Sequence, residues 1–229
     1  ESLHHSKVWV LHMNNHLACI NMIKQQLRTG DISNEQILHL YSSLPREDFV
    51  PSSFKPFAYS DMQIPLAHGQ RMMTPLEEAR VLQALDLDGS ETVLEVGTGS
   101  GFLTAMLSRL SKKVVSVDCY PEFTVNARKL LAAHECTNVE LFTGDAQQGW
   151  FDRAPYDVIV YTGSMRELTE TQRLQLVPGG RLFAMIGTAP AMRGRLFRLD
   201  HGMMWHEQEL FETSLPPLID KYKHNEFVF

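Results

Sequence analysis

The 229-residue sequence lacks several features that would place it in a special class of protein. No apolar run approaches the roughly 18 residues that a membrane-spanning helix needs, so we expect no membrane partner. No run of five or more like charges occurs, and 27 acidic residues outnumber 21 basic ones. Because a net charge of -6 disfavours contact with a phosphate backbone, no nucleic-acid partner is predicted either.

Cysteine is scarce, and histidines with a metal-binding spacing are scarcer. The three cysteines, Cys19, Cys119 and Cys136, are odd in number and lack metal-type spacing. They predict free thiols in a reducing compartment, and therefore a cytoplasmic location. His12 and His16 stand four residues apart and could face one ion, but no carboxylate accompanies them. No metal site is predicted.

The residues that are present predict an α/β fold of ordinary domain size, with 44% hydrophobic and 21% charged residues. Helical spacing of apolar residues appears over 17–27, and again after a capping-box pattern at 33–36. Thr74-Pro75-Leu76-Glu77 is the sharpest helix start, with a good N-cap and proline at the first helical position. Residues 49–69 read as a structured loop with three prolines.

From residue 93 onward, strands alternate with helices, which predicts a parallel sheet with right-handed crossovers. Strands are expected at the following segments: 93–96, 114–118, 139–142, 157–161 and 181–186. The last forty residues differ, because 195–199 and 203–211 alternate around a His201-Gly202 turn. They predict antiparallel strands at the end of the sheet.

The most informative stretch is Val93-Leu94-Glu95-Val96-Gly97-Thr98-Gly99-Ser100-Gly101. An apolar strand followed by alternating glycines that open a helix is typical of a nucleotide-cofactor loop. The third glycine comes one residue earlier than in the dinucleotide fingerprint G-x-G-x-x-G. With Glu95 two residues before the first glycine, the pattern resembles motif I of class I S-adenosylmethionine (SAM)-dependent methyltransferases. A glycine-rich turn without a ligand is the alternative.

Two more acidic residues follow later strands of the same sheet. Asp118 ends the second expected strand, a position that accepts hydrogen bonds from ribose hydroxyls in doubly wound folds. Asp145 follows the third strand, where the methyltransferase family often uses Asp to bind the adenine amino group. Either residue alone could be a strand-end cap. Three carboxylates at three successive strand ends, where ligands of such sheets bind, predict one cofactor site.

Over residues 22–221 the chain also resembles protein-L-isoaspartate O-methyltransferases. The segments that carry the resemblance are Leu44-Pro45-Arg46-Glu47-Asp48-Phe49-Val50-Pro51, Ile64-Pro65-Leu66 with Gly69-Gln70, the glycine stretch, Ala154-Pro155-Tyr156-Asp157, and Leu176-Val177-Pro178-Gly179-Gly180-Arg181-Leu182. The first segment is the most specific, because most SAM enzymes lack it.

The resemblance implies a doubly wound, Rossmann-like sheet, mostly parallel with an antiparallel C-terminal edge, and a small N-terminal helical lobe. We divide the chain into 1–12, a possible cloning remnant or extension, 13–75, the N-terminal helices and substrate loop, and 76–229, the SAM-binding core. The implied reaction moves the SAM methyl group to the α-carboxylate of isoaspartyl residues in proteins or peptides, and leaves S-adenosyl-L-homocysteine. Oligomeric state is not predicted.

The resemblance also implies the site residues. The cofactor contacts would be Gln70, Met72, Met73, Glu78, Glu95, Gly97, Thr98, Gly99, Gly101, Asp118, Cys119, Asp145 and Ala146. The catalytic position falls on Met73, with Thr74 beside it, and Ile64, His68 and Arg71 would contact the substrate. For His68, exposure on a surface loop is the alternative.

One departure affects the acceptor side. After Gly-Gln the family usually has Thr-Ile-Ser-x-Pro, but this chain has Arg71-Met72-Met73-Thr74-Pro75, so Met73 replaces the serine and offers no donor. Thr74 equally suits a helix N-cap, and Arg71 is either a carboxylate-binding fork or a plain surface residue. Ile219 and His224 replace polar cofactor contacts. Two alternatives therefore stay open: a SAM methyltransferase with another acceptor, and a SAM-binding domain without turnover.

Overall fold

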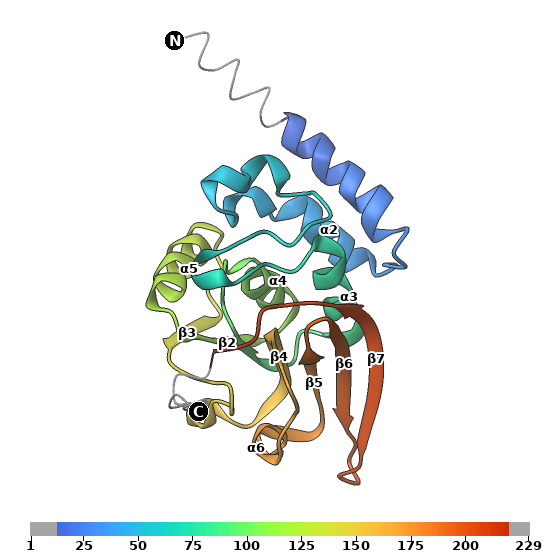
Figure 1. The fold of residues 1–229 in the computed structure, drawn as a ribbon, viewed down its shortest axis with the longest axis vertical. Helices are drawn as coiled ribbons and strands as arrows, with labels where there is room; N and C mark the ends of the chain where they lie inside the picture. The colour runs from blue at the N-terminus through green and yellow to red at the C-terminus, as the bar shows by residue number, and fades with distance from the viewer. Residues whose placement is uncertain (1–12, 220–229) are drawn as a thin grey trace, which may run out of the picture.

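The computed structural model describes residues 13–219 and is organised around one seven-stranded sheet of order β3-β2-β1-β4-β5-β6-β7 (Figure 1). The strands are β1 Thr92–Val96, β2 Lys113–Asp118, β3 Val139–Thr143, β4 Tyr156–Met165, β5 Leu176–Thr188, β6 Ala191–Leu199 and β7 Trp205–Thr213. Neighbours from β3 to β5 pair in parallel, and β6 and β7 pair antiparallel. The predicted α/β class with an antiparallel C-terminal edge is confirmed.

Helices cover the sheet unevenly. The helices are α2 Glu35–Ser43, α3 Pro75–Leu85, α4 Phe102–Leu110, α5 Pro121–Ala133 and the short α6 Glu170–Arg173. A further helix occupies residues 13–27 and ends in a π-helical turn, η1 Ile23–Leu27. Four short 3-10 turns lie in the connecting segments: η2 Arg46–Asp48, η3 Ser52–Phe57, η4 Ala67–Gly69 and η5 Phe151–Arg153. In the part of the chain that the structure describes, no helix combines the length and apolar character of a membrane span.

Alternate residues of the central strands point to opposite faces and bury two separate cores. Val93 and Val158 belong to the larger core, which includes side chains of α2, α3, α4 and α5. Leu94 and Ile159 face the smaller core, beneath the segments that follow β3 and β4. Residues of the N-terminal lobe, such as Tyr41, also lie in the larger core. The lobe and the sheet therefore share one hydrophobic interior, whereas the predicted division at residue 75 stays a prediction.

The N-terminal caps of α3 and α2 show where local sequence predicts a helix start correctly and where it does not. Thr74 caps α3 with the predicted box, since its hydroxyl accepts from the Glu77 amide at 3.1 Å and the Glu77 carboxylate accepts from the Thr74 amide at 2.8 Å. The capping box expected at 33–36 was wrong. Asn34 caps α2 instead, because the Ser33 and Asn34 amides both donate to the side-chain oxygen of Gln83 on α3.

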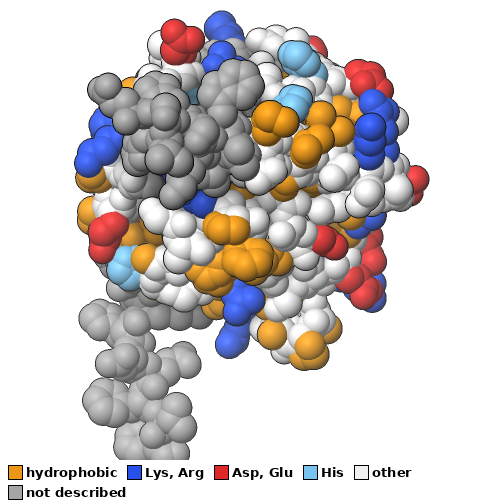
Figure 2. Space-filling view, turned by 90° about the horizontal axis from the view of Figure 1, so that it is seen from above, with side chains coloured by type: hydrophobic (Ala, Val, Ile, Leu, Met, Phe, Trp, Pro, Cys, Tyr) orange, Lys and Arg blue, Asp and Glu red, His pale blue; other side chains and the backbone are white. Residues whose placement is uncertain are grey.

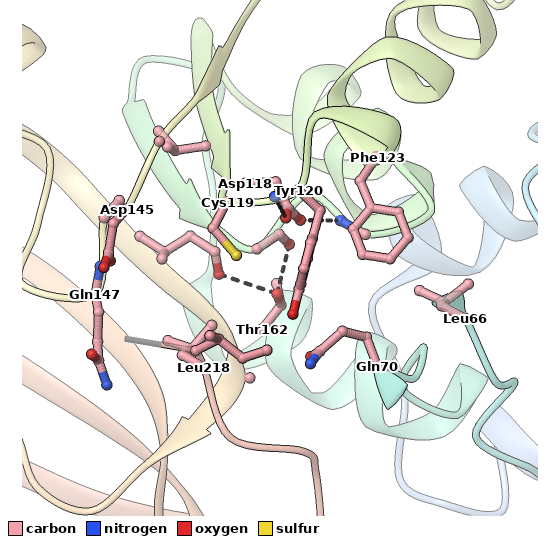
Figure 3. Close-up of a pocket in the computed structure, with 18 of the residues that line it drawn as sticks. Leu66, Gln70, Asp118, Cys119, Tyr120, Phe123, Asp145, Gln147, Thr162 and Leu218 are labelled. Atoms are coloured by element: carbon pink, nitrogen blue, oxygen red, sulfur yellow. Dashed lines mark hydrogen bonds between the residues drawn. The ribbon is translucent and has the colours of Figure 1, made fainter. Parts of the chain in front are cut away.

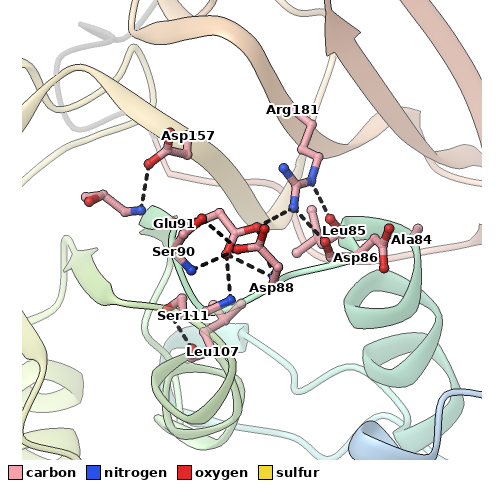
Figure 4. Close-up of polar contacts among 12 residues, drawn as sticks. Ala84, Leu85, Asp86, Asp88, Ser90, Glu91, Leu107, Ser111, Asp157 and Arg181 are labelled. Carbon is pink, nitrogen blue, oxygen red and sulfur yellow. Dashed lines mark hydrogen bonds and ion pairs between the residues drawn. The ribbon is translucent and has the colours of Figure 1, made fainter.

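Polar contacts fix the amino ends of the central strands, on the edge opposite the glycine loop (Figure 4). Arg181 of β5 donates to the Glu91 carboxylate at 2.8 Å and to the Asp86 carbonyl at 2.9 Å. Asp157 of β4 accepts from the Thr92 amide of β1 at 2.8 Å. Asp157 and Arg181, two of the residues that carry the family resemblance, therefore have structural partners at the opposite ends of the strands from the glycine loop.

Charged side chains of both signs are mixed on the molecular surface. On the face shown in Figure 2, Lys and Arg side chains alternate with Asp and Glu side chains around the rim, and hydrophobic side chains gather nearer the middle. Several charges are paired across the antiparallel edge, including Arg193 with Glu209 at 2.7 Å and with Glu212 at 3.2 Å. The described side chains visible on this face therefore form no single extended area of one charge.

Candidate cofactor and acceptor site

A pocket opens where the carboxyl ends of β1, β2 and β4 meet the loop after β3. Its lining includes predicted residues and neighbours that were not predicted (Figure 3): Leu66, Gln70, Arg71, Val96, Gly97, Gly99, Val117, Asp118, Cys119, Tyr120, Phe123, Gly144, Asp145, Ala146, Gln147, Thr162, Gly163, Leu218 and Ile219. The sheet order reverses between β1 and β4, so the pocket lies at the topological switch point where such sheets bind ligands. We call it the cofactor pocket.

The glycine loop forms one wall of the cofactor pocket because its backbone passes close to β4. Gly97 has φ +99, and a Cβ built there would lie 2.2 Å from the Thr162 hydroxyl oxygen. That hydroxyl donates to the Gly97 carbonyl at 2.6 Å, which fixes the turn after β1. Gly101, with φ +84, ends the loop as the N-cap of α4 and lies outside the pocket lining. Glycine is required at position 97 because Thr162 lies so close, and at both positions because the backbone is left-handed.

Asp118 stands at the end of β2 with its carboxylate in the pocket lining. One oxygen accepts from the Gly99 amide at 2.9 Å, and the other accepts from the Tyr120 amide at 3.0 Å. Burial raises the pKa of Asp118. A carboxylate accepts hydrogen bonds only, so Asp118 is the type of group that binds a ligand hydroxyl. Asp145 lines the opposite side of the pocket and accepts from the Gln147 amide at 3.0 Å.

Glu95 lies behind the loop rather than in the lining, with 0% of its surface exposed. One of its oxygens accepts from the Thr104 hydroxyl at 2.9 Å and from Ser116 at 3.4 Å. The other oxygen is buried without a hydrogen-bond partner among the described residues. Burial raises the pKa of Glu95 to about 8. Direct contact with a cofactor stays a prediction, but the orphaned oxygen is a group that a cationic ligand end nearby would stabilise.

Residues 64–72 form a hairpin that closes the cofactor pocket from the side of the N-terminal lobe; we call it the acceptor hairpin. The Met72 amide donates to the Ile64 carbonyl at 2.9 Å, and the Leu66 amide donates to the Gln70 carbonyl at 2.8 Å. Ile64 is fully buried and supports the hairpin rather than lining either pocket.

A second pocket adjoins the first along this hairpin. Its lining contains Leu66, Arg71, Met72, Met73, Glu78, Gly97, Thr98, Gly99, Ser100, Leu103 and Thr162, five of which also line the cofactor pocket. We call it the acceptor pocket. Met73 lines this pocket, and its side chain supplies no hydrogen-bond donor; its catalytic position stays a prediction. Arg71 lines both pockets, and so lies at their junction.

A buried ion pair supports the base of the acceptor hairpin. Arg46, 0% exposed, pairs with Glu78 at 3.0 Å and donates to the Met73 carbonyl at 2.9 Å. The Tyr41 hydroxyl donates to the other Glu78 oxygen at 3.2 Å. Burial raises the pKa of Glu78, and the Arg46 guanidinium opposes that rise. Both Glu78 oxygens are thus engaged by protein groups, and its predicted cofactor contact stays a prediction.

The remaining predicted residues are placed in different ways. Cys119 and Ala146 line the cofactor pocket, and Thr98 lines the acceptor pocket. Thr74 lines neither, since its hydroxyl is used in the α3 cap, so its catalytic role stays a prediction. His68 also lies outside both linings and stacks on Tyr120. His12 and His224 lie outside the described residues.

Sequence reasoning missed several residues of the lining. Tyr120 and Phe123 follow β2, and Thr162 lies within β4 beside the glycine loop. For Tyr120 and Phe123, the position just past Asp118 could have indicated a place in the pocket lining. Thr162 lies beside Gly97, a contact with the glycine loop. Leu218 and Ile219 are distant in sequence from the other lining residues. The hydrogen bond from the Leu218 amide to the Ser164 carbonyl, 2.9 Å long, places them beside β4. Ile219 does lie at the cofactor pocket, where the sequence had suggested a lost polar contact.

The residues present suit SAM. Apolar side chains such as Ala146 and Phe123 offer surfaces for a purine, and Asp118 offers acceptors for ribose hydroxyls. The buried, partner-free oxygen of Glu95 adds an acidic group behind the loop. Fold and pocket together define a class I SAM-dependent methyltransferase.

Comparison with known proteins identifies the family. The profile of the Protein-L-isoaspartate(D-aspartate) O-methyltransferase family matches residues 18–219. The chain is 39% identical over 199 residues to protein-L-isoaspartate O-methyltransferase 2 of Pelobacter propionicus, covering 86% of this chain and 88% of the relative. It is 38% identical over 166 residues to the protein-L-isoaspartate O-methyltransferase of Methanoculleus marisnigri, covering 72% and 76%.

Two solved structures share the fold. A protein-L-isoaspartate O-methyltransferase superimposes with a TM-score of 0.72 at 25% identity, over 83% of this chain and 62% of that one. The Plasmodium falciparum member, solved with S-adenosyl-L-homocysteine, gives a TM-score of 0.72 at 16% identity, over 90% and 98%. The chain belongs to the protein-L-isoaspartate O-methyltransferase family. Membership confirms the predicted family, fold and enzyme class, a SAM-dependent O-methyltransferase.

Proposed function

We propose that the protein transfers the methyl group of SAM to the α-carboxylate of isoaspartyl residues in proteins and peptides. The methyl donor of the family is SAM, which carries its methyl group on a positively charged sulfonium sulfur. After transfer, S-adenosyl-L-homocysteine leaves with an uncharged thioether sulfur. The acceptor is a carboxylate with an ordinary pKa near roughly 4, so it is ionised at neutral pH and needs no strong general base. The protein's task is therefore to orient the carboxylate and exclude water.

Arg71 is the observation that carries the proposal. Among the described residues that line either pocket, it is the only Lys or Arg, and it lies at the junction of the two. A guanidinium binds a carboxylate through two parallel hydrogen bonds, which fixes orientation as well as position. In this chain Arg71 would supply the polar contact to the acceptor that Met73 does not.

The test is methyl transfer from labelled SAM to an isoaspartyl peptide, with the matching aspartyl peptide as control. We expect base-labile label on the isoaspartyl peptide alone. Label at the level of the control, in protein that binds SAM by calorimetry, would refute the proposal. In Arg71→Gln we expect the KM for the peptide to rise about tenfold, the loss of roughly 1.4 kcal/mol expected for a charged hydrogen bond. Arg128→Gln, an exposed arginine of α5 outside both linings, is the control.

The second candidate is the same chemistry on a different carboxylate or hydroxyl acceptor. The buried Met73, 4% exposed, favours it, because the acceptor pocket is more apolar there than a serine would make it. Met73→Ser distinguishes the two. Increased isoaspartyl methylation would support an acceptor pocket adapted to another substrate, whereas unchanged methylation would show that this position does not select the acceptor.

We also propose that the protein works in the cytoplasm. Cys19 and Cys136 are buried free thiols in the described part of the chain, and free thiols persist in reducing compartments. Mass spectrometry of thiols alkylated within intact cells would test this, and disulfide-linked peptides would contradict it.

A further inference from the structure

The tip of the acceptor hairpin is attached to the edge of the cofactor pocket. The imidazole of His68 stacks on the ring of Tyr120, with centroids 3.9 Å apart and ring planes at 0°. His68 Nε2 also lies 3.1 Å from a Glu122 carboxylate oxygen, and the His68 ring meets Phe123 edge-on at 5.8 Å. Three side chains that follow β2 thus hold one side chain of the hairpin.

The backbone of the tip is held in an uncommon conformation. His68 has φ +56, in the left-handed region that side chains with a Cβ seldom adopt, and Gly69 follows with φ +69. Such a conformation in a histidine persists when its surroundings compensate for the cost. The stack on Tyr120 and the pair with Glu122 are the compensating contacts.

Tyr120 connects this attachment to the cofactor pocket. Its ring lines the pocket two residues after Asp118, whose carboxylate accepts from the Tyr120 amide at 3.0 Å. In Figure 3 the ring is seen edge-on, between Cys119 on one side and Phe123 on the other. His68 thus covers one face of the ring of a residue that lines the cofactor pocket.

The two ends of the hairpin are fixed differently. At its base, the Met73 carbonyl accepts from the fully buried Arg46. At its tip, the ion pair lies at the surface, since the His68 side chain is 33% and that of Glu122 65% exposed, although Phe123 next to it is buried. Leu66 and Gln70, which flank the tip, both line the cofactor pocket. The base is therefore held by a buried contact, whereas the tip is held by contacts that solvent partly reaches.

We propose that His68 is a positioning residue that holds Tyr120 against the bound cofactor, and that separation of the hairpin tip from Tyr120 controls release of S-adenosyl-L-homocysteine. The inference rests on the proposed function, because it requires SAM and its product to occupy the pocket. The same hairpin carries Arg71, so release of the tip also loosens the acceptor pocket.

The experiment measures the dissociation rate of S-adenosyl-L-homocysteine by stopped-flow displacement with excess SAM. His68→Asn removes the ring, while asparagine tolerates the left-handed backbone. We expect dissociation to become about 2- to 12-fold faster, the range that one aromatic pair predicts. Glu122→Gln keeps the stack and should change the rate less. In a Tyr120→Leu background, where no stack can form, His68→Asn should have little further effect.

An unchanged rate in His68→Asn, or an equal acceleration in the Tyr120→Leu background, would overturn the proposal. Thermal unfolding of each variant checks that the fold is retained, and His68→Gly, which suits the left-handed backbone, replaces His68→Asn if that variant unfolds. The rate is measured without any acceptor. If the variants change the dissociation rate of S-adenosyl-L-homocysteine as expected but the wild-type protein fails to methylate the isoaspartyl peptide, the proposed function alone is refuted.

Discussion

The two sides of the site are built by different means. On the cofactor side, Asp118 and the glycine loop sit at strand ends, and the sheet itself sets their positions. On the acceptor side, Arg71 belongs to a hairpin outside the sheet and Met73 directly follows it; Arg46 holds the base of the hairpin and His68 its tip. The difference teaches that this scaffold can keep its cofactor while its acceptor contacts change.

The largest expected effect comes from breaking the support at the base of the hairpin. Arg46→Met should lower the free energy of unfolding by about 3–5 kcal/mol, because it leaves Glu78 buried without its partner. Urea denaturation measures the loss. The double variant Arg46→Met with Glu78→Gln is the control and should recover part of it, since the unpaired charge is gone. A loss below about 1 kcal/mol would show that the pair does not support the hairpin.

Next in size is the effect of the buried acid behind the glycine loop. Glu95 has an ordinary pKa of 4.5 and a pKa of about 8 in the fold, so the folded state binds the proton more tightly. The cost of ionising it is absent below pH 4.5, grows as pH rises towards 8, and then stays constant. Glu95→Gln should therefore stabilise the protein at pH 8 by on the order of 2–4 kcal/mol.

The measurement is the free energy of unfolding of both proteins between pH 5 and pH 9. The gap should widen with pH, while Thr104→Val, which removes a hydrogen bond to Glu95 without removing its charge, should not produce the same widening. A constant gap would contradict the buried, proton-bound carboxyl. Calorimetric titration of Glu95→Gln with SAM will show whether the variant that is more stable also binds the cofactor more weakly.

On the cofactor side itself, Asp118→Ala should weaken SAM binding by about 1–3 kcal/mol, the usual cost of losing hydrogen bonds to a charged group. Part of the loss arises because the Gly99 and Tyr120 amides lose their acceptor. Calorimetric titration measures it, with Asp118→Asn as the variant that retains one acceptor oxygen. An unchanged affinity would mean that the ribose is bound elsewhere.

The smallest effect separates the helix cap from the chemistry. Thr74→Ala should lower the free energy of unfolding by about 1 kcal/mol, because the capping box of α3 is lost. The rate of methylation at saturating substrates should stay within a factor of two. Thr74→Ser, which keeps the hydroxyl, should restore stability. A large fall in rate for Thr74→Ala, restored by serine, would instead give this hydroxyl a role in catalysis.

Sequence reasoning reached the parts of the structure whose signals are local. The Thr74 box, the glycine loop and the acids at strand ends each lie within a few residues of the backbone feature that they serve. It failed where a distant residue competes for the same atoms. Gln83 takes the amides that the box at 33–36 would have used, and α2 is capped at Asn34 instead.

The same limit applied to the site. The contact between His68 and Tyr120 joins residues 52 positions apart, and the Leu218 amide reaches Ser164 across 54 positions. Neither pairing leaves a periodic pattern in the sequence, because a single side chain or amide suffices to make it. The residues of the acceptor hairpin were identified, but the contacts that hold the hairpin were not.

By itself, the sequence determined the α/β fold and the glycine-rich turn after β1, because strand periodicity and glycine spacing are short-range properties of the backbone. Its resemblance to a known family supplied the methyltransferase class. Only the tertiary structure decided where Arg71 and Met73 stand relative to that loop. Their positions depend on a buried arginine, an exposed aromatic stack and a returning C-terminal segment, and such contacts exist only once the chain has folded.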